Sequence, residues 1–279
     1  MKNSIKTLLC SFVIVCLLYL YHYRSQQQLD AVLFYAIRTN DIRGVELAIK
    51  NGANINCISW EKPIGTVEHF RRLFTKQYER PFNRLLSPIE LALINQQYDI
   101  AECLLKAGAN VNYLDSEGEN VFTYAVDLPE DLMSDKTLIT RKRRFANQLL
   151  DYGCPIQPRA LHLLCYQSCD PVLLRRVLKE HNYADLKFDE MPLIVYAASS
   201  EDPDCLVALL DAGADPNATG IDGTTALMRA CLHDNARMIN LLLSAGANPQ
   251  QHDQTGLTAV EIIRKYGSHE TRTLLKKYR

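Results

Sequence analysis

The chain has 279 residues, of which 47% are hydrophobic, and its 31 basic and 32 acidic residues leave a formal net charge of −1. This composition is that of a globular protein able to bury a large core. The charge balance argues against a nucleic-acid-binding surface, whose usual mark is a strongly basic domain.

The first 25 residues contain a candidate membrane anchor. Residues 7–23 carry no fixed charge and are rich in Leu, Val, Ile, Phe and Cys, with Lys6 before them and Arg24 after. As a helix this run would span about 25 Å, slightly less than the ~30 Å hydrocarbon core of a bilayer. We therefore predict an N-terminal transmembrane signal-anchor at residues 1–25 that associates with a membrane through residues 7–23.

Two other interpretations of this segment stay open. A cleaved secretory signal needs a small-x-small cleavage site, which residues 18–24 do not offer. A buried helix of a soluble domain is the other alternative. Lys2 and Lys6 lie on the N-terminal side of the apolar run. They favour a single-pass membrane protein with a cytoplasmic N-terminus and an exported remainder, periplasmic if the chain is bacterial.

The rest of the chain repeats one pattern. An Ala that ends a first motif precedes a Gly that ends a second by 16 residues in four places, at Ala36 and Gly52, Ala92 and Gly108, Ala197 and Gly213, and Ala230 and Gly246. This spacing predicts a pair of short helices, with Gly just past the second helix in a left-handed conformation. A single helix pair cannot bury its own apolar stripe, so we expect an all-α repeat solenoid.

The motifs resemble those of the ankyrin repeat family. Ser87-Pro88-Ile89-Glu90 and Thr225-Ala226-Leu227-Met228 stand where that family has Thr-Pro-Leu-His, and Ala107 to Asn112 read Ala-Gly-Ala-Asn-Val-Asn. The resemblance implies an ankyrin repeat domain at residues 30–279, built from helix-turn-helix units with hairpin turns. We expect about six to seven units, with approximate bounds 30–56, 87–118, 119–156, 159–185, 190–223, 224–256 and 257–279.

A long insertion at residues 57–86 separates the first two units. It holds Trp60 together with Phe70, Arg71, Arg72 and Tyr78. Aromatic residues and Arg are enriched in the residues that dominate binding at protein interfaces. The insertion therefore contacts a partner protein, or covers the gap between the two units, or does both.

A second insertion is expected at residues 127–144, between the two helices of the third unit. Acidic residues come first, and the run Arg141-Lys142-Arg143-Arg144 follows. We interpret it as a loop whose charges are solvated. A loop with separated acidic and basic halves would alternatively dock a charged partner or a lipid headgroup.

The resemblance also implies where a partner protein would bind. Ankyrin-like arrays bind through hairpin tips and the exposed side of each first helix, a concave strip. In this chain the strip would include Tyr113, Ser116, Glu117, Glu119, Ile221, Asp222, Gln254 and Thr255. We expect replacement of Glu117, Asp222 and Gln254 to weaken partner binding and to leave thermal stability unchanged.

Motifs for catalysis, metal binding or phosphate binding are absent from the sequence. We therefore expect no enzyme activity, no cofactor and no small-molecule substrate. His162 stands at the family's His position, where the resemblance implies a hydrogen bond between units. Cys103, Cys205 and Cys231 are predicted to be small buried hydrophobic residues.

The favoured function is a membrane-tethered protein-interaction module. One alternative is a cell-envelope immunity or inhibitor protein that neutralises a toxin or enzyme by direct binding. The other is a thiol-based redox or enzymatic role, for which Cys165 and Cys169, four residues apart, are the candidates.

Overall fold

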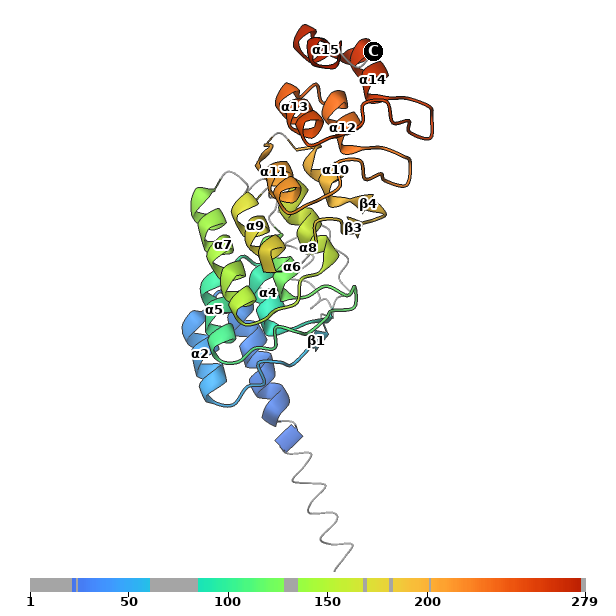
Figure 1. Cartoon of the computed structure of the whole chain (residues 1–279). Helices are drawn as coiled ribbons and strands as arrows, with labels where there is room; N and C mark the ends of the chain where they lie inside the picture. Colours follow the sequence, from blue (N-terminus) through green and yellow to red (C-terminus); the bar gives the residue numbers. More distant parts are fainter. Residues whose placement is uncertain are drawn as a thin grey trace, which may run out of the picture. The chain divides into compact units, whose positions relative to one another are not determined.

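The computed structural model describes residues 22–23, 25–60, 85–127, 135–167, 170–180, 183–200 and 202–276. Its contacts divide the chain between Val121 and Phe122 into an N-terminal part and a C-terminal part. Figure 1 shows the elements of each part. Among the described residues, no helix is both long enough and apolar enough to cross a bilayer. The predicted anchor at residues 7–23 lies outside the described residues.

The N-terminal part consists of helix pairs and a small hairpin. Residues 25–38 are helical. The named elements that follow are α2 (Ile42–Lys50), β1 (Ser59–Trp60), β2 (Leu85–Leu86), α4 (Pro88–Ile94) and α5 (Tyr98–Lys106). β1 and β2 pair antiparallel, with Ser59 opposite Leu86. Trp60 of the predicted binding insertion is thus in β1, while Phe70, Arg71, Arg72 and Tyr78 lie outside the described residues.

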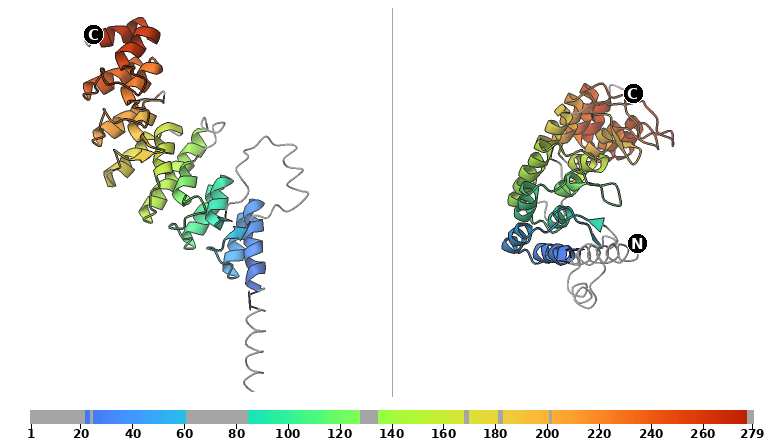
Figure 2. Two further views of the ribbon diagram at one scale, coloured as in Figure 1. Left: turned by 90° about the vertical axis from the view of Figure 1, so that its right-hand side faces the viewer. Right: turned by 90° about the horizontal axis from the view of Figure 1, so that it is seen from below.

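The C-terminal part continues with short helices and a second hairpin. Its elements are α6 (Val121–Val126), α7 (Lys136–Asp151), α8 (Pro158–His162), the π-helix η2 (Leu163–Gln167), α9 (Pro171–Glu180), β3 (Lys187–Phe188), β4 (Met191–Pro192), α10 (Leu193–Ala197), α11 (Asp204–Asp211), α12 (Ala226–Leu232), α13 (Ala236–Ser244), α14 (Ala259–Tyr266) and α15 (His269–Leu275). In the turned views of Figure 2 these helices follow one another in chain order toward the C-terminus. Successive first helices pack together, α10 on α12 and α12 on α14.

Helix ends follow the sequence pattern. Ser87 and Glu90 form a reciprocal capping box at the start of α4, and Thr258 and Glu261 do the same at the start of α14. The repeated Gly residues sit past the second helices with positive φ, namely Gly52 at 90°, Gly108 at 94°, Gly213 at 91° and Gly246 at 91°. The prediction of a left-handed residue there is confirmed. Gly accepts this conformation without the Cβ penalty of other residues.

Asn and Asp side chains connect neighbouring units. In the N-terminal part the Asn110 amide donates to the Asn56 side chain at 2.7 Å. In the C-terminal part the Asp215 amide donates to Asp185 at 3.0 Å, and the Asn248 amide donates to Asn217 at 2.7 Å. These bonds pair backbone N–H groups that would otherwise depend on solvent, so the polar loops fix the register of each unit on the next.

The third unit departs from the predicted loop. α6 ends at Val126 and α7 begins at Lys136, so the run Arg141–Arg144 lies in a helix and the expected insertion loop at 127–144 is wrong over its second half. Asp135 caps α7 by accepting from the Thr137 and Leu138 amides. The helix buries Lys142, Phe145, Ala146, Leu149 and Leu150. Their spacing of three and four residues places them on one helix face. The four consecutive basic residues make this apolar periodicity difficult to recognise in the sequence.

A carboxylate from the preceding unit binds the start of α15, the last described helix. Asp234, in the turn between α12 and α13, accepts from the Ser268 amide at 3.0 Å and from the Thr271 hydroxyl. The Thr271 hydroxyl and then the Ser268 amide hold the pKa of Asp234 below its usual range. This contact joins the start of α15 to the turn between α12 and α13 and so contributes to the attachment of α15.

We expect Asp234→Asn to lower the free energy of unfolding at pH 6, because the neutral side chain accepts weaker hydrogen bonds from Ser268 and Thr271. The loss should be only roughly 0.5 kcal/mol, since solvent screens an exposed carboxylate. A depressed folded pKa gives stability that is present above the unfolded pKa of about 4 and is lost as the pH falls through the folded pKa. The difference between wild type and variant should therefore shrink toward pH 3. Thermal unfolding followed by circular dichroism measures it. Asp211→Asn, an exposed substitution on α11, is the control, and an unchanged difference at both pH values would contradict the assignment.

Candidate protein-interaction surface

Hairpin turns project from the C-terminal part between its helix pairs. Asp189 and Glu190 connect β3 to β4 with φ of 46° and 59°. Two positive φ values in a two-residue turn match the twist of the flanking strands. In the next turn Asp222 accepts from the Thr224 amide at 3.0 Å and from its hydroxyl at 2.6 Å. Each turn is thus set by its own acidic side chain or by a left-handed backbone.

The last of these turns repeats the same arrangement. Asp253 accepts from the amides of Thr255 at 2.8 Å and Leu257 at 2.9 Å. Asp253 thus holds its own turn, as Asp222 does.

The hairpins lie against one another. The Gln254 amide donates to the Asp222 carbonyl at 2.9 Å, and the Gln254 side chain donates to the Ile221 carbonyl. A Cβ atom on Gly223 would approach the Cα of Asp253 to 3.0 Å, so only Gly fits there. On the other side, a Cβ atom on Gly220 would approach the Met191 side chain to 3.4 Å. We call this stacked set of turns, residues 187–192, 219–225 and 252–257, the hairpin edge.

The structure brings together the predicted strip residues of the C-terminal part. Ile221, Asp222, Gln254 and Thr255 are exposed on adjacent turns of the hairpin edge, and the Ile221 side chain is 71% exposed. Asp222 and Gln254 also hold the turns through their hydrogen bonds. We therefore expect their replacement to lower stability, contrary to the sequence-based expectation.

The other strip residues lie in a turn of the N-terminal part. Asp115 accepts from the Glu117 amide at 2.8 Å and the Glu119 amide at 3.0 Å. Ser116 and Glu117 are exposed, whereas Tyr113 and Glu119 are half-buried. Burial and then the nearby Glu90 raise the pKa of Tyr113.

An aromatic cluster, which the sequence analysis did not select as a binding site, lies at the foot of the hairpin edge. The His162 ring stacks on Phe188 with centroids 4.7 Å apart and on Tyr166 at 5.8 Å. Tyr196 of α10 meets the edge of His162 at 4.3 Å, and its hydroxyl donates to the Phe188 carbonyl at 3.2 Å. The hydrogen bond implied for His162 by the resemblance is thus replaced, among the described residues, by ring contacts.

This aromatic cluster is open to solvent. Tyr166 is 48% exposed, and His162, Phe188 and Tyr196 are half-buried. Burial lowers the pKa of His162, and the nearby Asp189 carboxylate opposes that shift. The imidazole is therefore neutral at pH 7 and packs as an aromatic ring. The spacing of His162 and Tyr166, four residues apart, was a visible signal, whereas contact with Phe188 and Tyr196 depends on how units stack.

The basic run of α7 is used inside the C-terminal part. Lys142 is 1% exposed, and Arg143 pairs with the buried Asp170 at 2.8 Å. Burial lowers the pKa of Lys142 to about 8, against the opposing charges of Asp170 and Asp127. Arg141 and Arg144 are the exposed members of the run. The interpretation of this run as a wholly solvated or partner-docking loop is therefore wrong for Lys142 and Arg143.

Most of the thiols that the structure describes are buried. Cys165 and Cys205 are fully buried, Cys103 is half-buried, and burial raises the pKa of Cys231 to about 12. A thiol that stays protonated is a poor nucleophile. Cys169, the other half of the possible redox pair, lies outside the described residues. Within the described ranges no group of His, Cys, Asp and Glu side chains is arranged to hold a metal ion.

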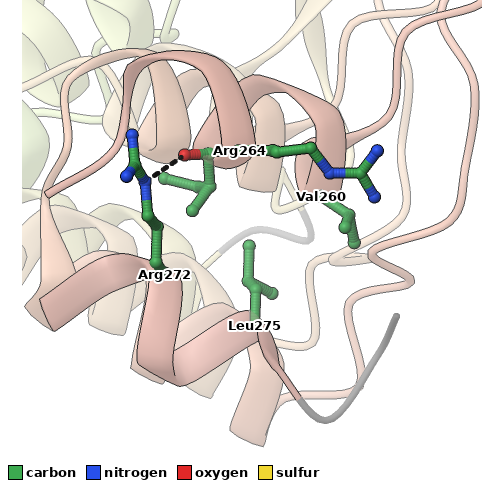
Figure 3. A pocket seen from close by; sticks show the side chains of 5 residues that line it. Val260, Arg264, Arg272 and Leu275 are labelled. Carbon is green, nitrogen blue, oxygen red and sulfur yellow. Dashed lines mark hydrogen bonds between the residues drawn. The ribbon is translucent and has the colours of Figure 1, made fainter. Parts of the chain in front are cut away.

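A small cavity lies between α14 and α15 (Figure 3). Val260, Arg264, Arg272 and Leu275 line it together with Ile263, whose carbonyl accepts from Arg272 at 3.4 Å. Its volume of about 10 Å³ is that of a single water molecule. Small-molecule sites are typically about 300–1,000 Å³, so this cavity is too small for such a ligand.

Comparison with known proteins agrees with the repeat architecture. A family model described as ankyrin repeats (many copies) matches residues 194–243. The NF-kappa-B p105 subunit of Gallus gallus is 30% identical over 178 residues, 63% of this chain and 18% of that protein. Protein PhlB of Serratia liquefaciens is 45% identical over 58 residues, 21% of this chain and 26% of that protein. The chain thus spans about a quarter or less of the length of these curated relatives.

Solved structures share the fold. The crystal structure of the human ASB11 ankyrin repeat domain has a TM-score of 0.60 at 20% identity and covers 88% of this chain and 96% of that chain. The ankyrin repeat domain of Bcl-3, a member of the IkappaB protein family, has a TM-score of 0.57 at 17% identity, with coverage of 88% and 97%. At these identities the likeness shows the fold alone. Together with the family match, it supports an all-helical ankyrin repeat array.

We expect Lys142→Met to leave stability at pH 7 unchanged or to raise it by about 1–4 kcal/mol, because it removes a buried charge and keeps a side chain of similar size. Since the folded pKa of about 8 lies below the ordinary value of 10.5, the unfolded chain binds more protons between them. Wild-type stability should therefore rise with pH from about 8 to 10.5, relative to the variant.

Urea unfolding at pH 7, 8.5 and 10 measures this difference. Lys136→Met on the exposed start of α7 is the matched control and should change little. A variant that is destabilised at every pH, with an unaltered pH profile, would show that Lys142 makes favourable interactions in its charged form.

Proposed function

We propose that this chain is a membrane-tethered protein-interaction module. It binds a partner protein through the hairpin edge and the aromatic cluster, and it does not carry out catalysis itself. Ankyrin repeat domains mediate protein–protein interaction, and the family match and the fold support such a domain here. The particular surface and the membrane tether are our own assignment.

The observation that carries the proposal is that the exposed Ile221 lies on a hairpin turn next to the hairpin that contributes Phe188 to the partly exposed aromatic cluster. Ile221 projects from the tip of one turn, and Tyr166 and Phe188 lie at the foot of another. Exposed aromatic and aliphatic groups on a surface that is rigid at its base are typical of protein-binding sites. The bonds from Gln254 fix the position of the tip that carries Ile221.

The chemistry of the described thiols and of the described cavity also supports a binding function over a catalytic one. The described thiols with resolved shifts have raised pKa values, and the described C-terminal cavity has room for only a water molecule. Neither feature favours a reactive centre in this part of the chain.

The tether is assigned to residues 7–23, with the N-terminus in the cytoplasm. It is supported by the uncharged run between Lys6 and Arg24 and by the basic residues that precede it. A tethered binder would meet its partner at the membrane surface, which raises the local concentration of both proteins.

We expect Ile221→Ser to reduce partner capture by roughly tenfold, since an exposed anchor at an interface contributes more than 1 kcal/mol when it is a hot spot. The measurement is quantitative co-purification from solubilised membranes with isotope-labelled wild type as reference. Val172→Ser is the matched control, because Val172 is 55% exposed at the start of α9, away from the hairpin edge. Equal capture by both variants would refute the hairpin edge as the binding surface.

We expect Leu17→Lys with Leu18→Lys to release the protein from membranes, because each Lys near the centre of a spanning helix disfavours insertion by about 3 kcal/mol. Carbonate extraction of membranes followed by immunoblotting measures the membrane fraction. Gln27→Lys with Gln28→Lys adds the same charge at exposed positions and should not change it. Wild type found wholly in the soluble fraction at full length would remove the tether from the proposal.

A further inference from the structure

We propose that the aromatic cluster and the turn beside it bind an arginine or lysine side chain from a segment of the partner protein. The components are the rings of His162, Tyr166, Phe188 and Tyr196 and the carboxylates of Asp189 and Glu190. This inference rests on the proposed function and adds the chemistry of the partner.

The geometry places carboxylates beside exposed rings. Asp189 and Glu190 directly follow Phe188, whose ring stacks on His162 at an interplanar angle of 17°. The Asp189 charge acts on both His162 and Tyr196, which places it close to these two rings. A cation over an aromatic face is attracted by the ring quadrupole, and a nearby carboxylate adds a charge partner.

The carboxylates are available to such a cation. Asp189 and Glu190 are exposed, and neither forms a hydrogen bond or ion pair with the residues that the structure describes. Both sit at positive φ in a two-residue turn, so their positions are set by the hairpin backbone. The hairpin backbone therefore positions both carboxylates, and within the described part of the chain neither carboxylate forms a hydrogen bond that holds the hairpin together.

Two cations of the chain lie near the rings, since the charge of Arg159 acts on His162 and that of Arg229 acts on Tyr196. Among the described residues, neither cation forms an ion pair with Asp189 or Glu190. Arg159 pairs with Asp127 at 3.7 Å. Arg229 lies close enough to Asp222 to help lower its pKa, after the larger effect of Thr224. Lys187 precedes Phe188 in β3, and successive strand residues point to opposite faces of a hairpin.

An arginine fits this combination better than a neutral side chain. Its planar guanidinium stacks on an aromatic ring and donates to carboxylates at the same time. Lysine offers the charge without the planar stacking. A neutral ring or aliphatic side chain would bury apolar surface against Tyr166 and leave the two carboxylates without a partner, so the charge complementarity favours a cationic segment.

The test uses the full-length protein in detergent micelles and a capped nonapeptide, Ser-Gly-Ser-Gly-Arg-Gly-Ser-Gly-Ser. A matched peptide carries citrulline, which has nearly the shape of arginine without its charge. Backbone amide NMR shifts locate binding and titration gives its strength. We expect the arginine peptide to shift the amides of residues 162–166, 187–190 and 196, and to bind at least roughly fivefold more tightly than the citrulline peptide.

Two variants separate charge from aromatic contact. Asp189→Asn with Glu190→Gln should abolish the preference for arginine over citrulline, and Tyr166→Leu should weaken binding of the arginine peptide. Asp211→Asn with Glu270→Gln removes the same charge at exposed positions elsewhere in the C-terminal part and should leave the preference intact. Unperturbed amide shifts outside the site confirm that each variant is folded.

Equal binding of the two peptides, or shifts confined to other residues, would overturn the inference. That result is distinguishable from failure of the proposed function. Loss of partner capture in Ile221→Ser together with equal peptide binding would keep the interaction surface and reject the cation site. A clear arginine preference together with partner capture that Ile221→Ser does not reduce would keep the cation site and reject the hairpin edge as the surface that captures the partner.

Discussion

The described helix pairs depend on one constraint, which is that a pair of short helices cannot bury its own apolar stripe. α12, for example, is seven residues long and buries Leu227, Ala230 and Cys231 because α10 and α14 of the neighbouring units pack beside it in addition to its own partner α13. Short isolated helices are marginal in water, so the stability of each unit comes from its neighbours. The polar loops serve the same constraint, since Asn217 reaches the backbone of the next unit and fixes how far successive pairs are offset.

Stacking also creates the candidate binding surface. Successive units of the C-terminal part stack in the same orientation, so their turns project on the same side and contact one another. Gln254, for example, donates hydrogen bonds to the carbonyls of Ile221 and Asp222 in the neighbouring turn. Residues far apart in the chain are thereby brought to one edge. The same stacking places Tyr196 of one unit against His162 of the preceding one, with Phe188 on the hairpin between them. Repeat arrays typically offer extended surfaces of this kind.

Much of the fold could be predicted from residue spacing. The interval of 16 residues from Ala to Gly located helix pairs correctly, as at Ala230 and Gly246, because Gly marks a backbone conformation that other residues avoid. The prediction failed where a rule of composition competed with periodicity. Around Lys142 the four consecutive basic residues indicated a solvated loop, while the spacing of Lys142, Phe145 and Leu149 is that of a buried helix face. The apolar spacing predicted this helix better than the local charge did, because packing against the rest of the C-terminal part buries Lys142 despite its charge.

The sequence by itself determined the repeat, the positions of the helix pairs that follow the Ala-to-Gly interval, and which turn tips carry Ile221 and Asp222, because these follow from local backbone preferences and from apolar periodicity. Only the tertiary structure decided that His162, Tyr166, Phe188 and Tyr196 share one cluster beside Asp189, and that Lys142 lies inside while Arg141 lies outside. These facts depend on the offset between stacked units. That offset is set by side-chain packing and hydrogen bonds between units that are distant in the chain, and spacing along the sequence does not encode it.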